Sequence, residues 1–306
     1  MEIFNPDSKI DFMGLSKWAA VFSGLVFAVS IWALSYYGLA LGLDFTGGTQ
    51  IEVSYKQSVD LNTVRSQLSA AGFNDGQSKV ISYGSSRDVL ISLAPQAGVE
   101  QSAMVQQVMK QLPGAEQKRV DVVGPQVGKE LAGKGALAIL VSMIVTMMYI
   151  AMRFEYRFAV SAIIALVHDP LLILGVFAFY GIEFDLKALA ALLAVIGYSL
   201  NDTIVVFDRV RENFKKLRRL NPTEVMNISI NQTLSRTIMT SALTLFVVIA
   251  LFVYGGETIH GFALALMIGI IIGTYSSIYV AGALAVLMGL NRNDFIARKR
   301  AVDNTP

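Results

Sequence analysis

The sequence predicts an α-helical integral membrane protein with six transmembrane helices and a small α+β domain between the first and second helix. Three observations predict this class. The 306 residues are 54% hydrophobic and only 16% charged, whereas a soluble domain carries about 25% charged residues. Six apolar runs come close to or exceed the about 20 residues that cross a bilayer. Residues 44–130 lose this apolar character and show strand and helix periodicities instead.

The six predicted crossings are bounded by charged or turn-forming residues. They cover residues 18–41, 136–152, 158–180, 188–207, 237–254 and 262–290. The first run exceeds the about 7–15 apolar residues of a signal peptide, and residues 1–17 before it carry no basic excess. We therefore expect an uncleaved anchor at 18–41, helices 2 to 6 within residues 133–290, and a tail at 291–306.

The basic residues predict the orientation of these helices. Of the 25 Lys and Arg residues, 15 lie in the segments on the side of the N-terminus, whereas the short loops on the opposite side carry only Lys187. Loops rich in Lys and Arg stay in the cytoplasm. Both termini are therefore predicted to be cytoplasmic, and residues 44–130 to face outward.

The outward interval has the pattern of a compact domain. Ile51, Val53 and Tyr55 alternate as in a half-buried strand. The pattern continues as helix, strand, strand, helix and strand over residues 61–71, 80–83, 89–93, 105–112 and 120–123. This order predicts a ferredoxin-like βαββαβ domain at 44–130. Gly124, Pro125 and Gly128 then interrupt regular structure and predict a hinge or linker.

Ionisable residues inside the predicted crossings are the functional candidates, because such groups are unfavourable in lipid. Asp169 lies beside His168 in the third crossing, Asp202 lies in the fourth, and Arg236 opens the fifth. Helical rise places Asp202 and Arg236 at one depth. Protonation of a paired carboxylate would release a helix contact. The alternative, for both Asp202 with Arg236 and Asp169 with His168, is a static pair that fixes helix packing.

Other polar and small residues in the crossings have simpler interpretations. Asp208 is followed by Arg209 and is predicted to be an interfacial carboxylate without a transport role. One face of the fifth crossing is polar through Thr237, Thr240, Ser241 and Thr244. The sixth crossing has small residues at every fourth position, namely Gly261, Ala265, Gly269, Gly273, Ser277, Ala281 and Ala285. They predict close helix packing, within this chain or with another subunit.

Several functions are excluded by missing residues and motifs. The chain has no Cys and only two His, and it has neither an HExxH motif nor a GxxxxGK[ST] phosphate loop. The net charge of +2 gives no basis for binding nucleic acid. We therefore expect no metal, no cofactor and no ATPase or other enzymatic activity. Gly47 and Gly48 alone predict only a turn that enters a strand.

Five motifs together resemble a known family. They are Leu-Asp-Phe-Thr-Gly-Gly at 43–48, Val-Gly-Pro-Gln-Val-Gly-Lys-Glu-Leu at 123–131, Arg-Phe-Glu at 153–155, the segment 198–213 around Asn201 and Asp202, and Ser-Arg-Thr at 235–237. From about residue 10 to 290 the chain resembles SecF, a bacterial protein translocase subunit of the SecD/SecF family in the resistance-nodulation-division superfamily.

The resemblance implies a function and a set of partners. It implies half of a transporter in the bacterial inner membrane, completed by SecD, with the large loop in the periplasm. It implies that SecDF joins SecYEG, SecA and small accessory membrane subunits, and uses the proton-motive force to draw exported unfolded polypeptides outward late in export. Asp202 and Arg236, with their neighbours Asn201 and Thr237, match family positions linked to proton conduction, and Asp169 matches a further one.

Two alternatives come from other classes. An intramembrane aspartyl protease would use Asp169 and Asp202, but its Gly-x-Gly-Asp signature is absent because Ser199, Leu200 and Asn201 precede Asp202. The second alternative is a homodimeric proton-driven transporter of lipids or small hydrophobic molecules in the same superfamily. Co-purification in mild detergent separates them: SecD and SecYEG favour the translocase subunit, and a homodimer without them favours the second alternative.

The topology can be tested with a reporter that is active only outside the cytoplasm. Fusions near Gln77 and Gly256 should be active, because these positions lie on the side poor in basic residues. Fusions near Lys216 and after Arg300 should be inactive. Activity at Lys216 would contradict the arrangement with six crossings.

Overall fold

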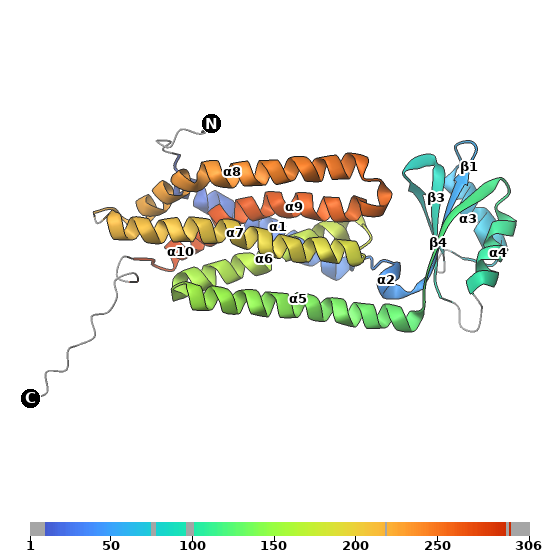
Figure 1. Cartoon of the computed structure of the whole chain (residues 1–306), viewed down its shortest axis with the longest axis horizontal. Coiled ribbons are helices and arrows are strands. Elements are labelled where there is room, and N and C mark those ends of the chain that lie inside the picture. The colour runs from blue at the N-terminus through green and yellow to red at the C-terminus, as the bar shows by residue number, and fades with distance from the viewer. Residues whose placement is uncertain (1–9, 75–77, 96–100, 218, 292–293, 295–306) are drawn as a thin grey trace, which may run out of the picture.

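The helices form an elongated bundle with a small mixed domain at one end (Figure 1). The structure is a computed structural model, and it describes residues 10–74, 78–95, 101–217, 219–291 and 294. Gln77, Arg300 and most of the predicted tail at 291–306 lie outside the described residues, as do residues 1–9 of the predicted cytoplasmic N-terminus. In the part described, six helices are long and apolar enough to cross a membrane, which confirms the predicted number.

The long helices begin or end beyond most of the predicted apolar runs. Short helical turns flank them at Met13–Leu15, Leu43–Thr46 (α2) and Glu257–Ile259 (η2). The long helices are α1 Ser16–Tyr36, α5 Pro125–Arg153, α6 Tyr156–Tyr180, α7 Leu186–Lys216, α8 Pro222–Tyr254 and α9 His260–Ser276. The helix α8 starts early because Asn221 and Glu224 form a capping box in front of its apolar part.

Two of the predicted crossings need correction. The first helix ends at Tyr36 rather than residue 41, and Gly38 follows with a φ of +72°, a conformation that does not continue a helix. The last crossing is not one α-helix. After α9 it continues as a π-helical segment, η3, at Ser277–Gly282 and then as α10 at Ala283–Leu287.

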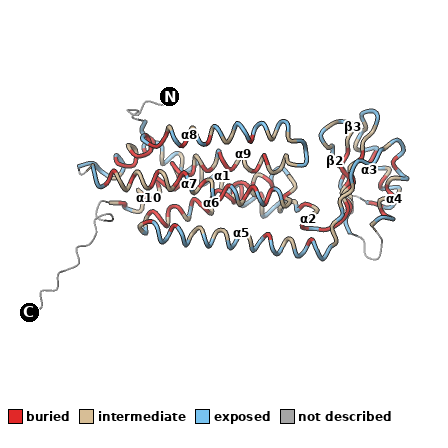
Figure 2. Tube along the Cα trace, viewed as in Figure 1, coloured by how far each residue is buried: buried red, intermediate tan, exposed pale blue. Residues whose placement is uncertain are grey.

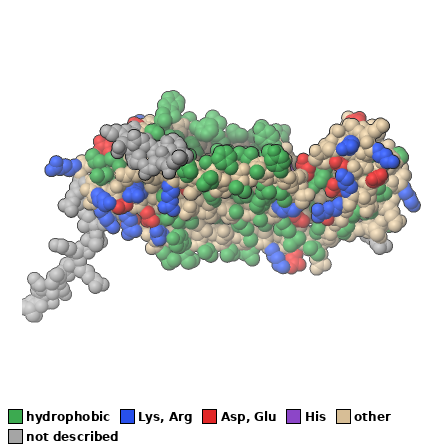
Figure 3. All heavy atoms as spheres, turned by 45° about the horizontal axis from the view of Figure 1, so that its top comes forward, with side chains coloured by type: hydrophobic (Ala, Val, Ile, Leu, Met, Phe, Trp, Pro, Cys, Tyr) green, Lys and Arg blue, Asp and Glu red, His purple; other side chains and the backbone are tan. Residues whose placement is uncertain are grey.

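Three helices form the interior of the bundle and three surround it. The most apolar windows of α6, α7 and α9 are 61%, 50% and 50% buried, whereas those of α1, α5 and α8 are 11%, 11% and 17% buried (Figure 2). The outer helices expose Leu, Val, Phe and Trp side chains along their length. Figure 3 shows this apolar surface over the bundle, with the charged side chains gathered at its end and on the domain. This distribution fits a protein that spans a bilayer.

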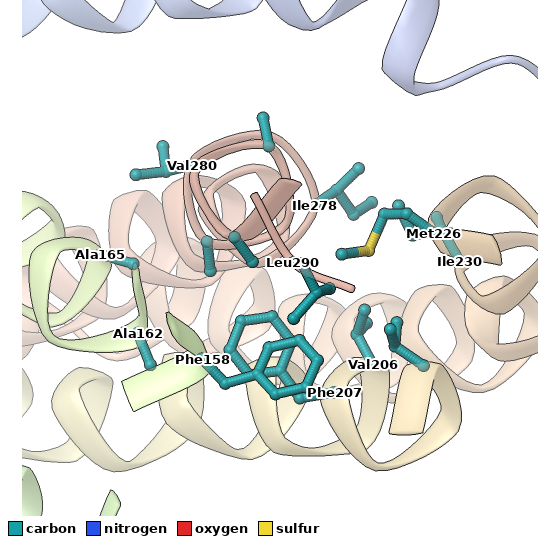
Figure 4. Packing of buried hydrophobic residues seen from close by; sticks show 14 of the residues in the cluster. Phe158, Ala162, Ala165, Val206, Phe207, Met226, Ile230, Ile278, Val280 and Leu290 are labelled. Carbon is teal, nitrogen blue, oxygen red and sulfur yellow. The ribbon is translucent and has the colours of Figure 1, made fainter. Parts of the chain in front are cut away.

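One apolar cluster packs the end of the bundle that carries the α5–α6 turn. The rings of Phe158 and Phe207 lie 4.3 Å apart between α6 and α7. Figure 4 shows Leu290, Met226 and Val206 converging on the same core, to which all of them belong. This core fixes the chain beyond α10 against the α6–α7 pair.

The small residues of α9 face α7 in the same chain, which answers the question that spacing left open. A Cβ on Gly269 would lie 2.2 Å from Cγ2 of Val195, and a Cβ on Gly273 would lie 3.0 Å from Cβ of Ser199. The two backbones therefore approach more closely than larger residues allow.

The domain contains the predicted βαββαβ order. Its strands are β1 Gly48–Tyr55, β2 Ser78–Tyr83, β3 Ser85–Leu93 and β4 Ala115–Val123. They form one antiparallel sheet in the order β2-β3-β1-β4, in which Ile51 pairs with Ile91 on one side and with Val120 on the other. The helices α3 Leu61–Ala70 and α4 Gln101–Gln111 pack on one face of the sheet. Its other face looks toward the bundle (Figure 1).

The predicted hinge at residues 124–128 is wrong. Gly124 is the N-cap of α5, Pro125 is its first residue, and Gly128 lies inside the helix. Proline is favoured at the first position of a helix because its missing N–H has no helical partner there. The chain therefore passes from β4 into α5 through a single extended residue.

The Gly269 contact can be tested with a matched pair of substitutions. Gly269→Ala should lower the free energy of unfolding by about 1–3 kcal/mol, because the added methyl group forces α7 and α9 apart. Gly24→Ala in α1, where nothing lies within 4 Å of the new Cβ, should not destabilise the protein. Unfolding temperatures of the purified protein in mild detergent compare the two. Equal temperatures would contradict the packing.

Candidate functional site

The Asp169 carboxylate is buried and fully hydrogen-bonded within the chain. It is 1% exposed in the middle of α6. Its Oδ2 accepts hydrogen bonds from the hydroxyls of Ser199 on α7, at 2.5 Å, and Ser276 on α9, at 2.7 Å. Its Oδ1 lies 2.9 Å from Nδ1 of His168. Three donors therefore replace the water that an ionised carboxylate needs.

The imidazole of His168 extends this network to a fourth helix. Its Nε2 lies 2.6 Å from the hydroxyl of Ser23 on α1. A ring with its proton on Nδ1 donates to Asp169 from Nδ1 and accepts from Ser23 at Nε2. The network thus ties α1, α6, α7 and α9 together at one point.

The Asp202 carboxylate is also buried but has fewer partners. It is 3% exposed on α7, one helical turn after Ser199, and its Oδ2 has no hydrogen-bond partner. The hydroxyl of Thr237 on α8 is 2% exposed and is also without a partner. On α8, the hydroxyl of Ser241 lies within hydrogen-bonding reach of the Asp202 carboxylate, and Arg236 is close enough to act on it through its charge. The structure therefore brings Asp202 and Thr237 to one interface and leaves both partly unsatisfied.

The hydroxyl of Ser241 also contacts two other side chains. It accepts a hydrogen bond from Tyr198 at 3.2 Å and lies 2.8 Å from Oγ1 of Thr274 on α9. Through these contacts Ser241 belongs to a network of polar side chains that runs from α7 through α8 to α9.

Arg236 and Asn201 lie outside this network of polar side chains, on the surface of the bundle. Both are exposed, and Arg236 makes no ion pair with Asp202 in the described part of the structure. They belong to an uncovered strip on adjacent faces of α7 and α8. Its exposed residues are Ala190, Ala194, Gly197 and Asn201 of α7 and Gln232, Arg236 and Thr240 of α8. A contact between Arg236 and Asp202 stays a prediction.

Asp208 pairs with an arginine at the end of the bundle. Its Oδ2 lies 2.6 Å from a guanidinium nitrogen of Arg153 at the end of α5, and both side chains are 41% exposed. Glu155 and Arg211 form a second bridge nearby, at 3.2 Å. This geometry agrees with the interpretation of Asp208 as an interfacial carboxylate.

The partners that distinguish the two buried carboxylates are not evident from the sequence. Ser276 is next to Ser277, one of the small residues that recur at every fourth position of the sixth crossing, but is not itself one of them. Ser199 lies inside the 198–213 motif, which has no polar periodicity around it. Both are serines inside an apolar run, and that is the signal that could have singled them out. Among the described residues, no group of three or more His, Cys, Asp or Glu side chains could hold a metal ion.

Comparison with known proteins gives consistent matches along the chain. Residues 103–291 match the family model "Protein export membrane protein SecD/SecF, C-terminal", and residues 34–59 match the "SecD/SecF GG Motif". The chain is 51% identical to the protein translocase subunit SecF of Vibrio alginolyticus, over 95% of this chain and 93% of that protein. It is 44% identical to SecF of Pseudomonas aeruginosa, over 97% and 98% of the two chains.

Two solved structures are similar as well. The structure of SecDF from Thermus thermophilus, described as a translocon-associated membrane protein, aligns with a TM-score of 0.86 at 37% identity and covers 94% of this chain. This chain spans 40% of the length of that SecDF chain. A SecDF structure described as the super-membrane-facing form aligns with a TM-score of 0.69 at the same identity.

The two carboxylates should differ in their effect on stability. In Asp169→Asn the new amide NH2 group faces side chains that themselves donate hydrogen bonds. The substitution should therefore lower the free energy of unfolding by about 2 kcal/mol. Asp202→Asn removes a buried charge that has one oxygen without a hydrogen-bond partner, so its effect should be much smaller or stabilising. Unfolding of both variants, measured side by side in detergent, tests this order. Equal loss in both would contradict it.

Proposed function

The chain belongs to the SecD/SecF family as a SecF-type protein translocase subunit, and on this premise we propose that it couples the proton-motive force to the late stages of protein export. In this proposal Asp202 is the group that takes up and releases the proton. The observation that carries it is the buried Oδ2 of Asp202 without a hydrogen-bond partner.

For a carboxylate to bind and release a proton, its protonated and its ionised form must be similar in free energy. Burial disfavours the charged carboxylate, whereas a nearby guanidinium favours it. Asp202 is subject to both effects, because it is 3% exposed and Arg236 acts on it from α8. Small changes in wetting or in the distance to Arg236 then decide its charge. Asp169 is different, since both of its oxygens have hydrogen-bond partners.

We propose that SecD covers the strip on α7 and α8. The strip exposes Asn201 and Arg236 at membrane depth, where an arginine facing lipid is strongly unfavourable. Small residues on α7, among them Ala194 and Gly197, leave room for a neighbouring helix to approach. The similar SecDF chain is much longer than this one, which leaves room in it for a second half. In such a complex Arg236 would be enclosed and could turn toward Asp202.

The proposed cycle has two steps. Water reaches Asp202 from outside and a proton neutralises it, so that the attraction to Arg236 is lost and the contact between α7 and α8 loosens. Release of the proton to the cytoplasm restores the pair. A ligand, here the proton, shifts such an equilibrium by its unequal affinity for the two states.

The remaining parts of the proposal follow from the family. They are the bacterial inner membrane as location, both termini in the cytoplasm, the βαββαβ domain in the periplasm, and SecYEG, SecA and small accessory membrane subunits as further partners. Exported unfolded polypeptides would be the substrate. The chain itself would act without ATPase activity, as a transport subunit.

The proposal predicts that Asp202→Asn abolishes the response of export to a proton gradient, because the amide keeps the shape of the carboxylate but does not titrate. Arg236→Lys should be partly defective, since it keeps the charge and loses the planar guanidinium. The assay is export into inverted membrane vesicles, with and without a gradient, after the ATP-dependent step has been arrested.

Asp208→Asn is the matched control for this assay. It makes the same substitution on the same helix, but at a carboxylate that is paired with Arg153 at the bundle end. It should respond to the gradient as the unmodified protein does. A full response in Asp202→Asn vesicles would make Asp202 a packing residue, and Asp169 would be the next candidate.

A further inference from the structure

The two glycine-containing motifs meet where the domain joins the bundle. A Cβ on Gly47 would lie 2.9 Å from Cα of Pro125, and a Cβ on Gly128 would lie 2.7 Å from the backbone nitrogen of Gly47. Any larger residue at either position would separate the two segments. The turn α2 is thus packed directly, backbone against backbone, on the first turn of α5.

Both chain connections of the domain pass through this contact. Gly48 at the start of β1 is the antiparallel partner of Val123 at the end of β4. The chain enters the domain from α2 and leaves it into α5, so the two covalent links lie side by side. We call this region, residues 43–48 and 124–128, the joint.

The joint is also bonded to the helix that carries Asp202. Oδ2 of Asp44 in α2 accepts a hydrogen bond from the backbone N–H of Leu186, the first residue of α7, at 3.0 Å. The ring of Phe45 lies 6.0 Å from that of Phe184, just before α7. A carboxylate at a helix N-terminus satisfies a free N–H and interacts favourably with the helix dipole.

The helix α7 is a single rod between these two carboxylates. It runs without interruption from Leu186 to Lys216. Asp202 therefore lies about 24 Å along the helix from the Asp44 contact, at about 1.5 Å per residue. A tilt or shift of α7 at Asp202 must also move the N-terminus that Asp44 holds.

Away from the joint, two exposed polar contacts link the domain to the bundle. Nζ of Lys79 lies 3.0 Å from Oε1 of Glu183, with side chains 49% and 28% exposed. The hydroxyl of Tyr83 lies 2.9 Å from that of Thr258. Exposed pairs of this kind contribute little free energy and exchange readily with water. The domain is therefore held firmly at the joint and loosely elsewhere.

We propose that Asp44 is a positioning residue that transmits movement of the Asp202 helix to the mixed domain. This inference rests on the proposed function, because it takes protonation of Asp202 as the cause of the movement. The domain would move together with the joint while the contacts of Lys79 and Tyr83 break and re-form.

The test measures a distance between the domain and the bundle. Because the chain has no Cys, spin labels can be attached at Ser66→Cys on α3 and Tyr180→Cys at the end of α6, both exposed positions. The complex with a Cys-free SecD is studied in lipid nanodiscs. Asp202→Asn mimics the protonated state and should shift the distance distribution. In the Asp44→Ala background this shift should be lost.

Two further variants separate transmission from simple capping. Asp185 also caps α7, through the N–H of Ala188 at 2.8 Å, but it belongs to the α6–α7 loop. Asp185→Ala should keep the shift. Asp44→Asn retains an oxygen that can accept from the N–H of Leu186, so the shift of the distance distribution should be kept in this background too. This variant can be measured even if Asp44→Ala does not fold.

The outcomes distinguish this inference from its premise. An undiminished shift in Asp44→Ala, or loss of the shift in Asp185→Ala as well, would overturn the role of Asp44 and leave the role of Asp202 intact. No shift on Asp202→Asn in the parent protein would overturn the proton-linked movement itself, and the inference with it.

Discussion

A charged side chain inside a bilayer must find its hydrogen-bond donors within the protein, because hydrocarbon offers none. This constraint separates the two buried carboxylates of the chain. Asp169 is surrounded by His168, Ser199 and Ser276, which come from three different directions and satisfy both of its oxygens. Asp202 keeps an oxygen without a partner. The first arrangement holds four helices in place, and the second is the one on which the proposed proton coupling rests.

Small residues make two close contacts possible, one beside Asp169 and one at the joint. Gly273 lets α9 approach α7 so closely that Ser199 and Ser276 both reach the same oxygen of Asp169. Gly47 and Gly128 do the same at the joint, where two backbones touch. The rigid parts of the molecule are thus built from contacts that larger side chains would prevent, whereas the polar contacts of Lys79 and Tyr83 are exposed and easily exchanged.

The sequence predicts the elements of this fold well, because long apolar runs and alternating strands have strong periodicities. It predicts their ends and interruptions less well. The positive φ of Gly38 ends α1 early, and the π-helical segment at Ser277–Gly282 lies inside an uninterrupted apolar run. Residues 124–128 have the composition of a hinge, yet Gly128 is helical because α2 packs against it.

The site could be predicted only in part for a similar reason. Ionisable residues in apolar runs stand out, so Asp169, Asp202 and Arg236 were identifiable from the sequence. Their partners were not, because Ser199 and Ser276 are brought to Asp169 by tertiary packing. Arg236 is exposed in the single chain, and in the proposed complex SecD encloses it. The position of a residue along an apolar run can be read from the sequence, whereas its hydrogen-bond partners depend on how the helices pack.

The central claim is that Asp202 changes its protonation state. Infrared difference spectroscopy of the SecDF complex in lipid, recorded as the pH is raised, measures this directly through the carbonyl stretch of protonated carboxylic acids. We expect the unmodified protein to lose such a band and Asp202→Asn to lack it, while Asp169→Asn retains it. A band that persists unchanged in Asp202→Asn would contradict the account.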